Sequence, residues 1–326
     1  MTPLLPDYID VSVIVATRGR QRGCQRLVRA IADQFLRFPE TSYEVLLVFD
    51  GCEVYDWVDP ADAHMRVQQL YEHAGIARAR NAGIDAARGQ LLAFLDDDCV
   101  PSATWLADLL RMSHEYPECV AFGGKVIGTD TANLYAQLRD AVYYLETFGT
   151  WYVDTVAAGD VVGAPYVNGG NSAYRRRALV ESGGFDEILP AYSDVELGRR
   201  LRLEQRAVLC ATMAIHHDHP ADFRQYMLRC WRSGSARGLL WACRGYPQDA
   251  PVAVVRAIVV NIAWRNAVRR RRRVSASPIH VISVLLCQEV VHGLGYLHAV
   301  TRHYCRGRAH RRTPAAPSVG GRASSP

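Results

Sequence analysis

The chain is predicted to have an α/β fold, in which a mostly parallel sheet is flanked by helices and followed by a C-terminal helical extension. Three runs, at residues 11–16, 43–49 and 90–95, are apolar on both faces, as in central strands covered by helices. Segments with apolar residues at helical spacing lie between them, within 24–35 and 73–87. Because strands that alternate with helices favour a parallel sheet, we expect a ligand site at the carboxyl ends of the strands.

The pattern predicts five further elements after these: a helix at 105–114, a strand at 120–127, a turn at 169–171, a helix from about 175 to 183, and a helix from 194 to 205. The length of 326 residues predicts one large domain over 8–245. An apolar and basic helical extension is expected over 246–305, and a disordered tail over 306–326. Aromatic residues between 129 and 162 show no clean period, which favours core packing over an adaptable loop.

Composition excludes several classes of protein. The formal net charge is +5, and Lys125 is the only lysine. The nine cysteines form no CxxC pair, and the N-terminus lacks a basic region followed by an apolar one, so we expect a reducing cytoplasm. No eighteen consecutive residues are apolar, so a classical spanning helix is not expected.

Three adjacent carboxylates, Asp96, Asp97 and Asp98, follow the apolar run at 90–95. Like charges this close repel one another unless a cation or solvent compensates them. On an extended chain Asp96 and Asp98 point to the same side and can reach one ion, and carboxylate oxygens suit Mg²⁺ or Mn²⁺. A solvated acidic turn is the alternative. Thr17 and Asp50 also end predicted strands, however, which favours convergence on one sheet edge.

Two nucleotide-binding classes fit poorly. P-loop hydrolases need GxxxxGK[ST], whereas the only lysine lies in a Gly-Gly-Lys-Val sequence at 123–126. A dinucleotide-binding fold needs GxGxxG after the first strand, and here only Gly19 and Gly23 stand in that region. The sequence therefore predicts neither class.

Five segments in order resemble the family 2 glycosyltransferases, which have the GT-A fold. These segments are VSVIVATRGR, ARARNAGIDAARGQLLAFLDDDCVP, NGGNSAYRRRALVESGGFDE, SDVELGRRLR and HHDHP, and the resemblance covers about residues 10–237. It implies a DxD motif at Asp96 and Asp98 that holds Mn²⁺ or Mg²⁺ against the diphosphate of a nucleotide sugar. The metal would neutralise charge on the departing nucleoside diphosphate.

The resemblance also implies roles in binding the donor and the acceptor. Nucleotide-sugar contacts are expected from the following residues: Thr17, Arg18, Asp50, Arg80, Asn81, Asp96 and Asp97. Arg80 is expected to supplement the metal as a charge clamp, although an arginine on a helix surface is an equal alternative. Gly170 and Asn171 are expected on the sugar or acceptor side, and residues 129–167 are expected to shape the acceptor site.

Asp194 is the expected catalytic base. Family members usually show Glu-Asp before a helix, and this chain has Ser193 in place of the glutamate. Asp194 would remove the proton of the acceptor hydroxyl, while its alternative role is to cap the helix that it starts. Glu196 is the reserve candidate, and Asp186 is expected to be structural.

His217 is expected to complete the metal site, because the family carries a histidine after a strand in this region. His216 is the neighbouring alternative. A zinc site is disfavoured because no cysteine pair accompanies these histidines.

The apolar and basic region at 251–300 favours peripheral contact with the inner face of a membrane over simple packing on the main domain. Nothing besides the arginine run at 269–273 supports nucleic-acid binding. The expected function is metal-dependent, inverting transfer of a sugar from a UDP-, GDP- or dTDP-linked donor to a hydroxyl of a glycan, a lipid-linked acceptor or a small molecule. A non-catalytic nucleotide-sugar-binding or scaffold protein is the alternative, and a nucleotidyltransferase is disfavoured.

Overall fold

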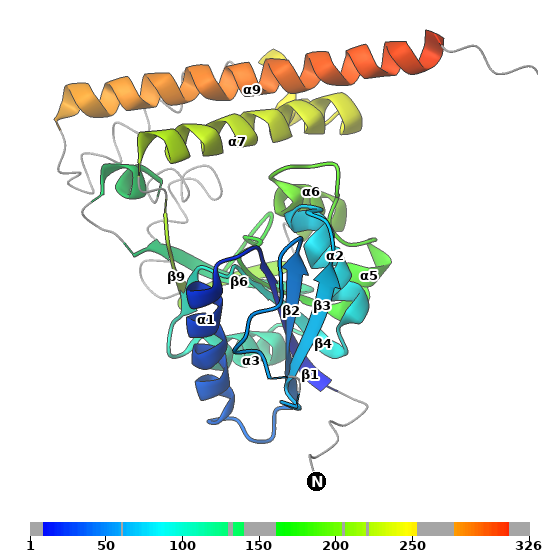
Figure 1. Cartoon of the computed structure of the whole chain (residues 1–326), viewed down its shortest axis with the longest axis vertical. Coiled ribbons are helices and arrows are strands. Elements are labelled where there is room, and N and C mark those ends of the chain that lie inside the picture. Colours follow the sequence, from blue (N-terminus) through cyan, green and yellow to red (C-terminus); the bar gives the residue numbers. More distant parts are fainter. Residues whose placement is uncertain are drawn as a thin grey trace, which may run out of the picture.

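The computed structural model describes residues 9–59, 61–129, 133–139, 161–203, 206–219, 222–252 and 277–312 (Figure 1). Its centre is a nine-stranded sheet in the order β3-β2-β1-β4-β8-β6-β9-β5, with β7 paired to β9. The strands are β1 Ile9–Thr17, β2 Tyr43–Asp50, β3 Met65–Leu70, β4 Gly89–Leu95, β5 Cys99–Pro101, β6 Ala121–Gly128, β7 Val161–Gly163, β8 Asn171–Arg175 and β9 Ala207–His217.

The sheet is mixed but mostly parallel in its first half, as predicted. Strands β3, β2, β1 and β4 are parallel to one another, and β6 is parallel to β9. Strand β8 lies antiparallel between β4 and β6, while β5 and β7 pair antiparallel with β9. The central strands β1, β2 and β4 are buried almost throughout, which explains why their sequences are apolar on both faces.

Helices flank this sheet. They are α1 Gln21–Phe35, α2 Ile76–Ala86, α3 Trp105–Glu115, α5 Arg176–Glu181, α6 Ser193–Leu201, α7 Phe223–Arg244 and α9 Pro278–Arg312, with a 3-10 turn, η2, at Pro247–Asp249. Helix α1 buries Leu27, Val28 and Ile31 on one side, as their spacing predicts. Helix α2 packs on β1 and β2, where Gly83 lets it approach Ile14.

Several elements differ from those expected. Strands β3, β5 and β7 and the long helix α7 were not predicted, and Asn171 begins strand β8 instead of belonging to a turn. Helix α6 ends at Leu201 and not at 205, because Arg202 takes a left-handed backbone with φ 52°. Most of the aromatic segment at 129–162 lies outside the described residues. Within it Tyr135 contacts the rings of Phe223 and Tyr226, which is core packing.

Helices α7 and α9 form a separate layer on one side of the sheet, with α7 nearer the sheet and α9 outermost (Figure 1). Helix α9 continues to Arg312, past the expected boundary at 305, while residues 253–276 with the arginine run lie outside the described residues. The part of α9 at Ile279–Cys305 is long and apolar enough to cross a membrane. The sequence did not predict this, because polar residues interrupt the apolar run. Core helices of soluble proteins also reach this length and apolar content, and 39% of the most apolar eighteen-residue stretch of α9 is buried inside the molecule.

Candidate active site

A cleft of about 1550 Å³ lies between the carboxyl ends of the strands and helix α7. Its walls include most of the side chains expected from the sequence, namely Thr17, Arg18, Asp50, Arg80, Asp96, Asp97, Asp98, Gly170, Asp194 and His217. The expected ligand site at the strand ends therefore corresponds to a real cavity. The side of the cleft opposite the strands is formed by α7 residues such as Gln225, Leu228 and Arg232.

Asp96 follows the last residue of β4, and its carboxylate faces the cleft. Arg80 of α2 donates to Asp96 Oδ1 at 2.9 Å, and His217 Nε2 lies 3.7 Å from Oδ2. A Cβ on Gly170 would lie 2.4 Å from Asp96 Oδ2, and one on Gly169 would lie 2.4 Å from Arg80 Nη1. A side chain at either position would therefore displace this ion pair, which gives a structural reason for the Gly-Gly sequence.

Electrostatics separate the two aspartates of the motif. Burial opposes ionisation of Asp96, but the nearby ring of His217 and the charge of Arg80 outweigh it and hold the pKa of Asp96 below its ordinary value. Burial raises the pKa of Asp98, assisted by the negative charge of Asp96 and opposed by His217 and Arg20. A bound cation would therefore stabilise the ionised form of Asp98 more than that of Asp96.

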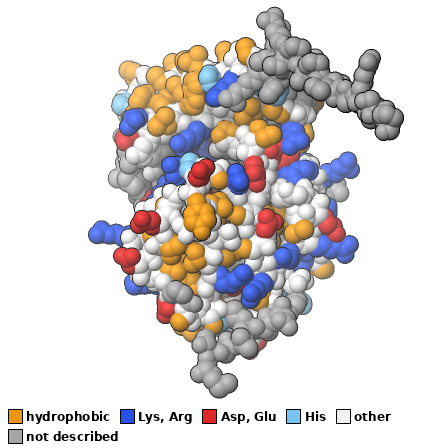
Figure 2. Space-filling model, turned by 45° about the vertical axis from the view of Figure 1, so that its right-hand side comes forward, with side chains coloured by type: hydrophobic (Ala, Val, Ile, Leu, Met, Phe, Trp, Pro, Cys, Tyr) orange, Lys and Arg blue, Asp and Glu red, His pale blue; other side chains and the backbone are white. Residues whose placement is uncertain are grey.

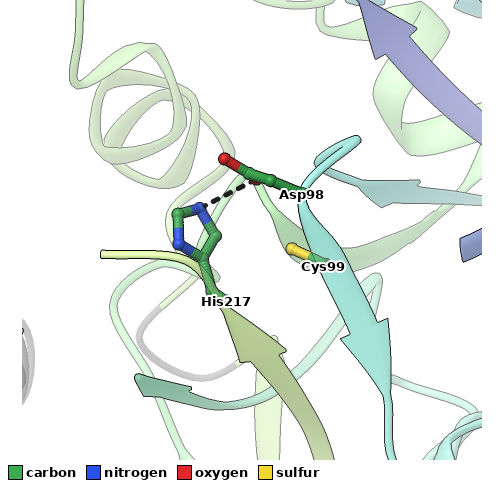
Figure 3. A group of neighbouring side chains, drawn as sticks. All are labelled: Asp98, Cys99 and His217. Atoms are coloured by element: carbon green, nitrogen blue, oxygen red, sulfur yellow. Dashed lines mark ion pairs between the residues drawn. The ribbon is translucent and has the colours of Figure 1, made fainter. Parts of the chain in front are cut away.

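His217 reaches this site because of strand register. It ends β9 directly opposite Cys99 of β5, and its Nε2 lies 3.2 Å from Asp98 Oδ1 (Figure 3). Side chains alternate along a strand, so His216 points the other way and is exposed. The structure thus brings His217, and not His216, to the aspartates.

The residues here suit a hard divalent cation. Asp98 Oδ1 is buried and has no hydrogen-bond partner, while it faces the ring of His217, so a cation would satisfy an otherwise orphaned oxygen. The sulfur of Cys99 is close enough to join Asp98 and His217 in a group of ligand atoms within 4.8 Å (Figure 3). Burial, together with the charges of Asp96 and Asp98, raises the pKa of Cys99 well above its ordinary value. Cys99 therefore stays a thiol, and the oxygen donors favour Mg²⁺ or Mn²⁺.

The carboxylate of Asp97 contacts the end of β1 and the residue before α1. Its Oδ2 accepts a hydrogen bond from Thr17 Oγ1 at 2.7 Å, and its Oδ1 accepts one from Arg20 Nη1 at 2.9 Å. The same Arg20 nitrogen lies 2.9 Å from Asp98 Oδ2. Thr17 also shares a hydrogen bond of 2.6 Å with Tyr55 Oη. Asp97 therefore ties the ends of β1 and β4 together beneath the cleft.

The end of β2 organises a second wall of the cleft. Asp50 accepts hydrogen bonds from the backbone N–H groups of Ala74 and Gly75 at 2.6 and 3.1 Å, and His73 Nδ1 lies 2.7 Å from the same carboxylate. Arg18 contacts His73 Nε2 at 3.1 Å. The sequence-predicted Arg18 and Asp50 are thus connected through His73, which was not predicted.

Asp194 lies in the first turn of α6 and faces the same glycine turn as Asp96. Its Oδ2 accepts a hydrogen bond from the N–H of Gly169 at 2.9 Å, and its Oδ1 accepts one from Val195 at 2.9 Å. The N-cap position belongs to Tyr192, which has a left-handed backbone and no capping side-chain bond. Asp194 therefore contacts the same Gly169–Gly170 turn that packs against Asp96.

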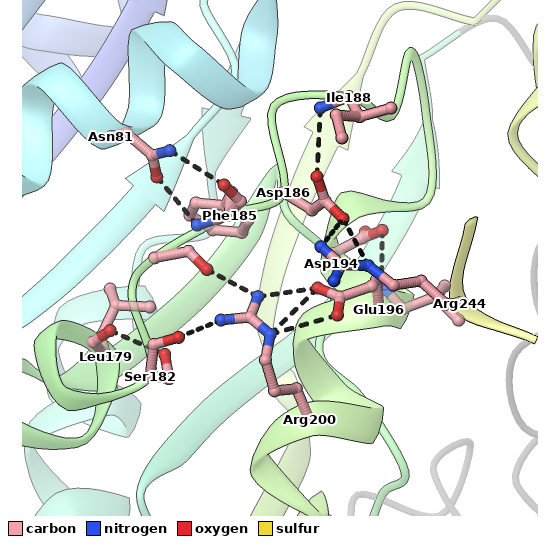
Figure 4. Close-up of polar contacts among 12 residues, drawn as sticks. Asn81, Leu179, Ser182, Phe185, Asp186, Ile188, Asp194, Glu196, Arg200 and Arg244 are labelled. Atoms are coloured by element: carbon pink, nitrogen blue, oxygen red, sulfur yellow. Dashed lines mark hydrogen bonds and ion pairs between the residues drawn. The ribbon is translucent and has the colours of Figure 1, made fainter. Parts of the chain in front are cut away.

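Glu196 and Asp186 have structural partners instead of facing the cleft (Figure 4). Buried Glu196 accepts from Arg200 at 2.7 Å, and Arg200 also donates to the carbonyl of Gly184 at 2.7 Å. Asp186 accepts from Arg244 at 2.6 Å. These two ion pairs fix α6 and the C-terminal end of α7 to the 182–188 segment.

Two sequence-predicted residues do not line the cleft. Asn81 bonds both backbone groups of Phe185, with Nδ2 2.9 Å from its carbonyl and Oδ1 2.8 Å from its N–H (Figure 4). Asn171 is fully buried, accepting from Trp105 at 2.8 Å and donating to the carbonyls of Lys125 and Met213. Their amides are committed to holding loops and strands in place, so the expected direct contacts with donor and acceptor are not supported.

Sequence reasoning also missed residues that the fold brings to the cleft. Arg20, His73, Glu187, Arg199 and Asp249 line it, and none was expected there. For Arg20, the only indication in the sequence was its position in the loop between β1 and α1. Asp249 lies fifty residues after Arg199 in the chain, so only tertiary structure brings the two together.

The fold, with its curled and mostly parallel sheet and its strand-end aspartates, is that of the GT-A glycosyltransferases. A mannosyltransferase from Pyrobaculum calidifontis, solved in complex with GDP-Man and Mn²⁺, superposes with a TM-score of 0.55 at 18% identity, covering 93% of this chain and 86% of that one. The family model described as glycosyl transferase family 2 matches residues 12–183, which is more than half of the chain. The chain belongs to glycosyl transferase family 2.

Two curated relatives carry names of related activities. The pre-mycofactocin glycosyltransferase of Mycobacterium tuberculosis is 28% identical over 264 residues, covering 77% of this chain and 52% of that protein. The O-antigen biosynthesis protein RfbC of Myxococcus xanthus is 28% identical over 226 residues, covering 64% of this chain and 17% of that protein. The chain thus spans about half of the length of the first relative and less than a fifth of the length of the second.

Proposed function

We propose that this chain is a metal-dependent, inverting glycosyltransferase that moves a sugar from a nucleotide-sugar donor to an acceptor hydroxyl. The observation that carries this proposal is the shared glycine turn. Gly169 donates its N–H to Asp194, and Gly170 packs against the carboxylate of Asp96. One turn therefore connects a candidate base with the candidate metal-diphosphate site, as a single displacement at a sugar carbon requires.

The donor would lie across the strand ends. Arg18 and Asp50, with His73 between them, would bind the nucleoside, while Thr17 and Asp97 support the floor beneath it. Arg80 would face the diphosphate beside Asp96 as a charge clamp. A UDP-, GDP- or dTDP-linked sugar is consistent with these groups.

Asp96, Asp98 and His217 would hold Mn²⁺ or Mg²⁺. When bound, the ion would stabilise the charge that develops on the departing diphosphate. Arg80 and His217 keep Asp96 ionised for this purpose, as the lowered pKa of Asp96 indicates. Arg20 holds the second oxygen of Asp98 in place.

Asp194 would take the proton of the acceptor hydroxyl. The N–H groups of Gly169 and Val195 fix its carboxylate, so the orientation of the base does not depend on the substrate. The segment between Glu187 and Tyr192 lines the cleft beside it and would contact the acceptor. The acceptor would be a glycan or a lipid-linked molecule.

The decisive experiment compares Asp194→Asn with Asp33→Asn, a matched change at an exposed position of α1. We expect Asp194→Asn to lower transferase turnover by about 10²–10⁴-fold and to leave nucleotide binding nearly unchanged, because a general base acts only in the chemical step. Asp33→Asn should match wild type. Full activity of Asp194→Asn would exclude it as the base. Absence of any Mn²⁺-dependent hydrolysis or transfer of nucleotide sugars by the wild type would favour a non-catalytic binding protein.

The organisation of the chain follows from this proposal. Residues 8–245 would form the catalytic domain, and the region after it would keep the protein at the inner, cytoplasmic face of a membrane through residues 251–300. The cleft lies between the sheet and α7, so the helical layer would also form one wall of the acceptor site.

A further inference from the structure

We infer that the outer face of α9 docks in the plane of an anionic lipid bilayer, which deepens the proposed function and rests on it for the side of the membrane. The outer face consists of the apolar side chains that point away from α7: Ile279, Ile282, Leu286, Val290, Leu294 and Leu297. They are 40–79% exposed. Figure 2 shows hydrophobic side chains gathered at this end of the molecule. Their spacing of three and four residues makes one continuous stripe.

This face has no charge along most of its length. Among the exposed positions that the structure describes between Ile279 and Thr301, none is Asp, Glu, Lys or Arg. Large apolar surfaces of this kind mark contacts with membranes or other proteins. The length of the stripe, about five turns of helix, matches a helix lying along an interface.

The opposite face of α9 is fixed to α7, so the helix is not free to insert across a bilayer. Gly234 and Gly295 allow the two backbones to touch: a Cβ on Gly234 would lie 1.9 Å from the carbonyl oxygen of His292, and one on Gly295 would lie 2.4 Å from that of Trp231. Tyr226 of α7 is hydrogen-bonded to buried Gln288 of α9. A spanning helix would have to break these contacts and leave polar groups in lipid.

The charges of α9 fit an anionic surface, because its only acidic residue, Glu289, is buried. Arg302 is exposed at the C-terminal end of the outer face, and the sequence places the arginine run at 269–273 just before its N-terminal end. Each arginine near anionic lipid should strengthen binding about fivefold.

The same charges argue against a second copy of the chain as the occupant. Both ends of the outer face are flanked by arginines in the sequence, so either orientation of two paired α9 helices would bring arginines together. Lipid phosphates remove that repulsion. Because α7 lies between α9 and the cleft, docking would also place the α7 wall of the cleft toward the bilayer (Figure 1). That position favours an acceptor carried by a lipid.

The test is flotation of the purified full chain with vesicles of phosphatidylcholine alone or mixed with phosphatidylglycerol. We expect binding to the anionic vesicles only. The double variant Leu286→Glu, Leu294→Glu should lose about tenfold or more in partition, because it places charges in the apolar contact. Arg302→Ala should lose about fivefold. Leu36→Glu, at an equally apolar exposed position after α1, should bind like wild type.

Circular dichroism of each variant separates loss of docking from loss of fold. Equal binding of wild type and the double variant, or no binding by either, would overturn the inference. A dimer in light scattering that Leu286→Glu dissociates would assign the face to a second copy. Resistance of wild type to alkaline extraction from membranes would assign α9 as a spanning helix. Flotation needs no donor or metal, so its outcome is independent of whether the proposed transferase activity is found.

Discussion

Asp96, Asp97 and Asp98 differ in what each carboxylate contacts, so the same substitution should have different effects at 97 and 98. Asp98 has an orphaned oxygen facing His217, whereas both oxygens of Asp97 accept hydrogen bonds from Thr17 and Arg20. Mn²⁺ at about a hundred times its Kd should stabilise the wild type by about 2.7 kcal/mol. We expect Asp98→Asn to abolish most of this stabilisation together with activity.

Asp97→Asn should instead lower the free energy of unfolding by about 1 kcal/mol, because it weakens one buried hydrogen bond, from Thr17, and one partly buried hydrogen bond, from Arg20. It should retain most of the Mn²⁺ response. Urea denaturation of both variants with and without Mn²⁺ provides the measurement. If Asp97→Asn lost the stabilisation by Mn²⁺ and Asp98→Asn kept it, the assignment of the two carboxylates would be reversed.

The grouping of Asp96 and Asp98 was inferred from the sequence on the assumption of an extended chain. The three aspartates instead lie between β4 and β5, with a turn at Asp97 and Asp98. The choice of His217 over His216 came from the family resemblance alone, and the pairing of β9 with β5 supplies its physical reason. The expected contacts of Asn81 and Asn171 with donor and acceptor stay predictions, since neither residue lines the cleft. A motif shows that an amide is needed but not whether it faces a ligand or a backbone, and here both amides bond to backbone groups.

Among the elements, the strands with long apolar runs and the helices with clear spacing were predictable. A strand buried on both faces is a continuous apolar run, and a helix buried on one face has apolar residues at intervals of three and four. Strands β5 and β7 have three residues each, which is too short for any period to show. The first residue of β8, Asn171, was interpreted as part of a turn because Gly169 and Gly170 precede it, yet these glycines serve the contact with Asp96 and Arg80.

Helix α6, which carries Asp194, is joined to the helical layer through one buried carboxylate. Asp249 contacts Arg199 of α6 and Arg237 of α7, and its carbonyl accepts from Tyr296 of α9 at 2.8 Å. We expect Asp249→Asn to lower the free energy of unfolding by about 2 kcal/mol, because two partly buried arginines would lose the charge of their shared buried carboxylate. Denaturation in urea measures this, with Asp33→Asn as the control. Stability equal to wild type would show that the three helices are held by packing alone.

On the scale of the whole molecule, the boundary expected after residue 245 divides groups that the structure joins. Helix α9 covers Tyr226 and Met227 of α7, while η2 supplies Asp249 to α6. A chain that ends at 245 would expose the buried face of α7 and leave Arg199 without this partner. Burial of each large apolar side chain contributes about 1.5–3 kcal/mol, so several such losses approach the whole stability of a domain.

We therefore expect the 1–245 fragment to aggregate or to melt well below the full chain, and to lose activity in proportion to its unfolding. Removal of residues 313–326 is the matched control, because α9 ends at Arg312, and should leave the melting temperature unchanged. Thermal denaturation and light scattering of the three proteins provide the comparison. A soluble 1–245 fragment with the melting temperature of the full chain would show that the helical layer is an appendage. In that case α7 would form its wall of the cleft without support from α9.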